Sequence, residues 1–187
     1  MEVNIHGKNW WFVEKETKHI VASTAKELYK DYWDDYFKFS FVRNPWDRML
    51  SMARIYLWSG VRVKSGKIDI SEYLKKYPKI EVDPRSKSSS DVFNPISNSV
   101  YLNLLNEQLD FIGRFENLQD DYNYVLESIG MRPRLLRNNE RSHKPGNIMD
   151  YSKYHDDYTK YYNDETVRLV AEKYAKDIEY FGYKFGE

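Results

Sequence analysis

The sequence predicts an α/β domain in which a small parallel sheet is flanked by helices. Residues 37–42 alternate large apolar and polar side chains and then become apolar, which is typical of a strand. A break at 43–45 separates this strand from a helical stretch that is stopped by Gly60. A second short apolar segment, 109–113, is again followed by a helical pattern. Strands that alternate with helices favour α/β layers.

The first half of the chain is expected to hold three helices. A capping-box pattern at its start predicts a helix over 24–36. After the strand, Pro45 suits the first turn of a helix over 45–58, and Asp47 favours the positive end of its dipole. A short helix is expected at 70–77.

The second half of the chain is expected to hold three more helices. One lies near 97–106. Asn117 can cap the next one, which Gly130 closes. The last begins near Asn163. The two longer helices have these apolar stripes: Leu118, Tyr122, Val125, Leu126 and Ile129 in the first, and Val167, Val170, Tyr174 and Ile178 in the second.

The composition excludes several functional classes. The 187 residues suit one domain, and 41% of them are hydrophobic, so the chain is globular. Lys+Arg and Asp+Glu balance at 29 each, which gives no general attraction to nucleic acid, so any anion site must be local. The absence of cysteine excludes disulfides and a cysteine nucleophile. No stretch is typical of a signal peptide or a membrane span, so we expect a cytoplasmic protein without membrane contact.

The strand–turn–helix unit over 39–56 carries the most information about function. Arg43 lies at the end of the strand and Ser51 about two turns into the helix. In open α/β sheets this edge binds anionic ligands. A guanidinium, a nearby hydroxyl and the free N–H groups of a helix start could together bind a phosphate. The same local pattern also fits a surface or capping arginine and an inert helical serine.

Residues 39–51 (FSFVRNPWDRMLS) resemble the 3'-phosphate-binding motif of sulfotransferases that use 3'-phosphoadenosine-5'-phosphosulfate (PAPS), especially those that modify carbohydrates. Residues 110–118 are similar to the second strand of that family and its turn. Residues 138–142 and 177–185 are similar to its C-terminal end. The motifs occur in the family's order, and the resemblance covers about 19–185.

This resemblance implies a single domain, 1–187, with the three-layer fold of P-loop nucleotide hydrolases, truncated at the N-terminus. Residues 60–98 would form an irregular insertion on the acceptor side. The implied activity is sulfuryl transfer from PAPS to a hydroxyl of a carbohydrate or a small hydroxylated molecule. Arg43 and Ser51 match the residues that hold the 3'-phosphate of PAPS, or of the product PAP.

The resemblance also suggests roles for residues elsewhere. His19 lies where the family carries its general base, although it also fits an exposed histidine near a helix start. The resemblance also implies a loop that closes over the nucleotide and contains Arg141, Ser142 and Lys144. The same residues also fit a plain basic surface loop. The family needs no metal, and adjacent acidic pairs fit solvated helix faces. Arg114 is expected to be structural and to pair with an acid such as Glu116.

One part of the family pattern is not found. A loop that cradles the 5'-phosphosulfate should precede His19, and the atypical segment 1–18 does not contain it. The chain could be a fragment of a longer sulfotransferase, could receive the loop from another chain, or could be a non-catalytic relative that binds PAP or another anion. A missing strand would leave an open sheet edge, which favours a homo-oligomer. Carbohydrate recognition by the many Tyr and Trp residues is a third alternative.

Overall fold

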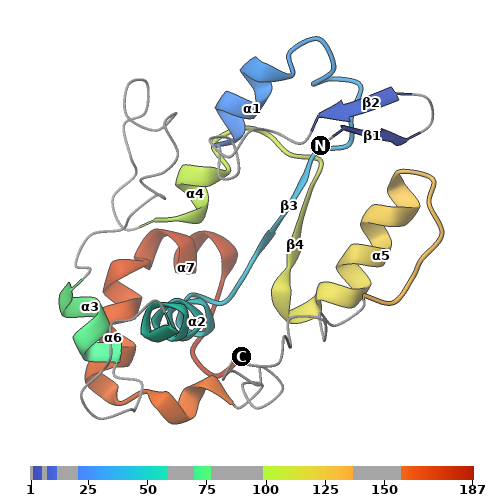
Figure 1. Cartoon of the computed structure of the whole chain (residues 1–187). Helices are drawn as coiled ribbons and strands as arrows, with labels where there is room; N and C mark the ends of the chain where they lie inside the picture. Colours follow the sequence, from blue (N-terminus) through green and yellow to red (C-terminus); the bar gives the residue numbers. More distant parts are fainter. Residues whose placement is uncertain (1, 6–7, 12–20, 59–69, 77–98, 137–156) are drawn as a thin grey trace.

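The protein is described by a computed structural model that covers residues 2–5, 8–11, 21–58, 70–76, 99–136 and 157–187. The described strands form two pairs (Figure 1). Strands β1 (Glu2–Ile5) and β2 (Lys8–Trp11) are antiparallel, whereas β3 (Phe39–Val42) and β4 (Phe111–Arg114) are parallel.

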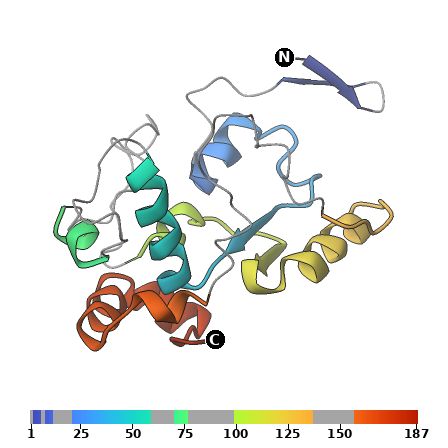
Figure 2. The ribbon, with the colours of Figure 1, turned by 60° about the horizontal axis from the view of Figure 1, so that its bottom comes forward.

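Helices lie on both sides of the parallel pair, with α5 on one side and α2, α6 and α7 on the other (Figures 1 and 2). The α/β class is therefore confirmed, while the full three-layer fold stays a prediction. None of the helices described is long and apolar enough to cross a membrane. The helices are α1 (Ala22–Leu28), α2 (Pro45–Trp58), α3 (Ile70–Lys76), α4 (Tyr101–Leu104), α5 (Leu118–Ser128), α6 (Asp164–Lys173) and α7 (Ala175–Phe181), with the 3-10 turns η2 (Phe115–Asn117) and η5 (Tyr158–Tyr161).

The register of β3 and β4 is fixed at both ends of the pair. At the amino ends, the Lys38 N–H donates to the Asp110 carboxylate at 2.7 Å, and the Lys38 ammonium pairs with the same group at 3.0 Å. At the carboxyl ends, Val42 lies opposite Arg114. Because parallel strands end at the same edge, the residues that follow β3 lie beside those that follow β4.

Gly113 allows β3, β4 and α5 to approach closely. It lies opposite Phe41, and a Cβ atom at this position would stand 2.5 Å from one ring carbon of Phe41 and 3.1 Å from the Cβ of Asp121.

We expect Gly113→Ala to lower the free energy of unfolding by about 2 kcal/mol, since overpacking forces neighbours to shift. Urea titration measures this, and the loss should shrink in a Phe41→Leu background. Equal losses in both backgrounds would contradict the close contact.

The core lies between α2 and the C-terminal helices. The apolar face of α2 is buried against α3 and α6, and its fully buried side chains include Met49 and Leu50. Trp46 joins the helices by polar contacts as well: its indole N–H donates to the Val167 carbonyl at 3.0 Å, and its carbonyl accepts from the Tyr162 hydroxyl at 2.6 Å. These contacts fix the first turn of α2.

The predictions for α2 and α3 are confirmed, but α1 begins earlier than expected. Its capping position is Val21, and the helix proper ends at Leu28, with hydrogen-bonded turns beyond it. The N–H of Ser23 donates to the Asn106 side chain at 2.9 Å, and the Asn106 amide donates back to the Ser23 hydroxyl at 2.9 Å. This cap comes from 83 residues away, so a local capping pattern could not reveal it.

Two further predictions need correction. The Asn117 side chain does not cap α5, because it donates to Asp121 at 2.8 Å instead. The last predicted helix is two helices that meet at Tyr174, although the first begins next to Asn163 as expected. The Asn163 side chain forms a capping box with Thr166 there. The bend redirects α7, which contacts α4. Within the region predicted as a helix over 97–106, the described helix is the short α4.

Candidate functional site

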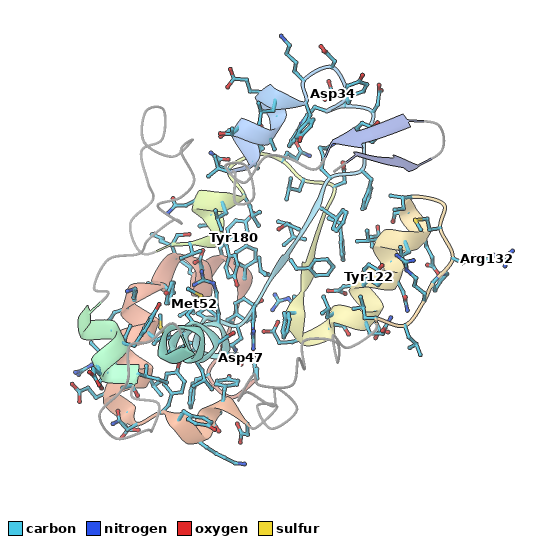
Figure 3. The ribbon with its side chains drawn as sticks, in the orientation of Figure 1. Asp34, Asp47, Met52, Tyr122, Arg132 and Tyr180 are labelled. Atoms are coloured by element: carbon cyan, nitrogen blue, oxygen red, sulfur yellow. The ribbon has the colours of Figure 1, made fainter. Side chains whose placement is uncertain are left out.

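The candidate site lies where β3 and β4 end. Arg43 follows β3 directly, and its Nε–H donates to the Asp47 carboxylate at 2.6 Å. Its guanidinium carbon lies 4.2 Å from the centre of the Phe115 ring, which is a close cation–π contact. Figure 3 labels Asp47 at the start of α2, on the side near the end of β4. The Arg43 side chain is 25% exposed, so it is held in place yet reachable from solvent.

Asp47 and Ser51 lie on the same face of α2, because Ser51 follows Asp47 by four residues. Arg43 precedes the helix and contacts the first of them, Asp47. Ser51 is half-buried. Among the residues that the structure describes, the Arg43 guanidinium bonds to a carboxylate through its Nε–H, and no hydrogen bond joins its Nη groups to one. The Nη edge of the Arg43 guanidinium and the hydroxyl of Ser51 are therefore the groups that can bind an anion.

The backbone N–H groups at the start of α2 are largely occupied. The Arg43 N–H donates to the Tyr101 hydroxyl at 2.9 Å, the Asn44 N–H to Glu116 at 2.5 Å, and the Trp46 N–H to the Asn44 side chain at 3.1 Å. Proline at position 45 has no N–H. The expectation that free N–H groups of this helix start bind a phosphate is therefore wrong for Arg43, Asn44 and Trp46.

Asn44 joins this turn to the C-terminal segment. Its side chain is buried and donates to the carbonyls of Lys184 at 3.0 Å and Glu187 at 3.4 Å. The segment is held again by Tyr158, whose hydroxyl accepts from the Gly186 N–H at 2.7 Å. The turn after β3 is thus bonded to the C-terminal segment, about 140 positions further along the chain.

Arg114 does not pair with Glu116, contrary to expectation. Its guanidinium donates to the Phe181 carbonyl and lies 4.8 Å from the centre of the Tyr183 ring. Because a carbonyl at the end of α7 attracts a cation, Arg114 is a structural residue, as expected, with a different partner. Glu116 is thereby left to face the Asn44 N–H and the Tyr183 hydroxyl, the latter at 3.4 Å.

The tyrosines around the site are neutral hydrogen-bonding groups. Burial raises the pKa of Tyr101, although the nearby Arg48 lowers it in part. Burial raises the pKa of Tyr183 further, and the negative charge of Glu116 adds to this effect. Burial also raises the pKa of Tyr174 to about 12. Their hydroxyl groups therefore stay protonated at neutral pH, and they act here as donors, acceptors and packing surfaces.

The structure describes two of the predicted site residues, Arg43 directly after β3 and Ser51 within α2, and their role in binding stays a prediction. The other four lie outside the described residues, and their roles stay predictions: His19, Arg141, Ser142 and Lys144. Sequence reasoning missed Tyr101, Phe115 and Glu116 as neighbours of Arg43. The last two could have been placed there, since they follow the second predicted strand and so belong to the same sheet edge. No local sequence pattern indicates that Tyr101 lies beside Arg43, which is 58 residues away.

The chain has recognisable relatives. A model described as "Sulfotransferase family" matches residues 6–184. Carbohydrate sulfotransferase 14 of Danio rerio is 29% identical over 168 residues, which cover 79% of this chain and 44% of that protein. The chain therefore spans less than half the length of this relative. No solved structure gives a significant match.

Proposed function

Because this chain belongs to the sulfotransferase family, we propose that it transfers a sulfuryl group from PAPS to a hydroxyl of a carbohydrate or a small hydroxylated molecule. The observation that carries the proposal is Arg43 at the end of a parallel strand, bonded to Asp47 on the face of α2 that also carries Ser51. The printed name of the Danio rerio relative supports a carbohydrate as the acceptor.

The residues at the site fit the 3'-phosphate of the donor. The Nη edge of Arg43 can donate two parallel hydrogen bonds to a phosphate, and the Ser51 hydroxyl can add a third donor. Asp47 and Phe115 hold the guanidinium by its Nε and by its face, so this edge is presented in a defined direction. A second set would supply further phosphate contacts: Arg141, Ser142 and Lys144. When bound, PAPS supplies the activated sulfuryl group, with PAP as the leaving group.

We assign the role of proton acceptor to His19. The acceptor hydroxyl loses its proton as its oxygen bonds to sulfur, and a neutral imidazole within hydrogen-bond reach would take that proton. The test is transfer of radiolabelled sulfuryl groups from PAPS to a panel of carbohydrates. Labelled product lost in His19→Ala supports both the activity and this role. Binding of PAP without transfer to any acceptor would favour a non-catalytic nucleotide-binding relative, and glycan binding that ignores PAP would contradict the proposal.

Ser51→Ala is expected to weaken PAP binding about tenfold, which is the effect of losing one hydrogen bond to a charged group. Isothermal titration calorimetry measures the dissociation constant. Ser128→Ala is a matched control, because Ser128 is an exposed residue of α5 whose hydroxyl donates to the Tyr124 carbonyl. An unchanged dissociation constant in Ser51→Ala would remove Ser51 from the site.

A further inference from the structure

Two consecutive residues at the end of β4 hold two consecutive residues at the end of β3. The Phe115 ring lies under the guanidinium of Arg43 at 4.2 Å, and the Glu116 carboxylate accepts the N–H of Asn44 at 2.5 Å. The parallel register, with Val42 opposite Arg114, brings these pairs side by side. One contact fixes the Arg43 side chain, and the other fixes the peptide that follows it.

Glu116 takes a position that anionic ligands often occupy. A phosphate at the start of a helix is usually bound by the first backbone N–H groups, which carry the positive end of the helix dipole. Here a carboxylate of the protein accepts the N–H just before Pro45. A phosphate cannot accept from the Asn44 N–H while Glu116 does. The binding of a phosphate at this turn therefore relies more on the Arg43 guanidinium and on the direction in which it points.

The contacts of Glu116 show why its position is defined. One of its oxygens accepts from Asn44, and the other lies 3.4 Å from the hydroxyl of Tyr183. Asn44 is itself buried and tied to the C-terminal segment through Lys184. The carboxylate thus joins β4, the turn after β3 and the C-terminal segment at one point.

We propose that Glu116 is a positioning residue for anion binding: it fixes the turn after β3 so that Arg43 meets the 3'-phosphate of the nucleotide with its Nη edge. The identity of the ligand rests on the proposed function, but the effect of Glu116 on Arg43 does not. What Glu116 contributes is an acceptor oxygen for the Asn44 N–H. Its negative charge is not needed by the ligand, which is also an anion.

Two substitutions separate the acceptor from the charge. Glu116→Gln keeps an oxygen that can accept from Asn44 and removes the charge, whereas Glu116→Ala removes both. We expect Glu116→Gln to bind PAP at least as tightly as the wild type, and Glu116→Ala to bind it about tenfold or more weakly, since one hydrogen bond is worth about this factor. Glu127→Ala, at an exposed position of α5, is the control and should leave binding unchanged.

A second readout does not involve the nucleotide. In the ligand-free protein, the Arg43 Nε–H is bonded to Asp47 and should give a protected side-chain NMR signal. We expect this signal to persist in Glu116→Gln and to exchange much faster in Glu116→Ala, measured where circular dichroism shows that both variants are folded. Fast exchange in Glu116→Ala with no PAP binding by the wild type would sink the proposed function and leave the positioning role standing. An unchanged Arg43 signal in Glu116→Ala, or equal PAP affinities for the alanine and wild-type proteins, would overturn the positioning role.

Discussion

Asp177→Ala is expected to lower the free energy of unfolding by about 3 kcal/mol or more, because it leaves several buried donors without acceptors. The Asp177 side chain is fully buried in α7. Its oxygens accept from the Ser99 hydroxyl at 2.5 Å and from the Val100 N–H at 2.6 Å, and the next N–H groups, of Tyr101 and Leu102, lie 3.1 to 3.3 Å away. This single carboxylate caps α4.

Two variants serve as controls for Asp177, measured by urea denaturation. Asp177→Asn keeps one acceptor oxygen and should cost less than the alanine change. Glu179→Ala removes an exposed carboxylate of the same helix, whose pair with Lys176 at 3.6 Å is solvated, and should cost less than about 0.5 kcal/mol. A loss below about 1 kcal/mol in Asp177→Ala would contradict the capping role, since one lost hydrogen bond already costs about that much.

The second large effect is expected for Arg43→Ala, which should weaken PAP binding about 100-fold, the value of a charge-assisted, two-point contact with phosphate. The fold should be little affected, because the pair with Asp47 is partly exposed and Asp47 remains favourable at a helix start. Arg43→Lys should also bind weakly, since an ammonium cannot present two parallel donors.

The matched control for Arg43 is Arg134→Ala. The Arg134 guanidinium also lies against an aromatic residue, because its Nη2 donates to the Tyr122 hydroxyl at 2.9 Å. Tyr122 belongs to α5, so this arginine is not at the ends of the strands. Arg134→Ala should leave PAP binding unchanged. Equal losses in the two alanine variants would show a general effect of positive charge rather than a site at Arg43.

Much of the local structure could be predicted, because it depends on neighbouring residues. The alternation before Arg43 predicted β3, and Pro45 predicted the first turn of α2. The helix start at Asn163 was predicted as well, and it uses Thr166 only three residues away. Each of these signals lies within one turn or one strand of the feature that it specifies.

Other contacts could not be predicted, because distant residues supply them. The helix starts of α1 and α4 receive acceptors from Asn106 and Asp177, which are 83 and 75 to 78 residues away. The residues at the capping positions of these two helices make no side-chain capping hydrogen bond. The same holds for Tyr101, whose hydroxyl meets the N–H of Arg43 only after the fold has formed.

The most direct test of the central claim is a cycle of four calorimetric titrations. The wild type and Arg43→Ala are each titrated with PAP and with adenosine 5'-phosphate, which lacks the 3'-phosphate. If Arg43 meets that phosphate, Arg43→Ala loses about 100-fold in affinity for PAP and almost nothing for adenosine 5'-phosphate. Equal losses for both ligands, or no loss for either, would show that Arg43 does not bind the 3'-phosphate.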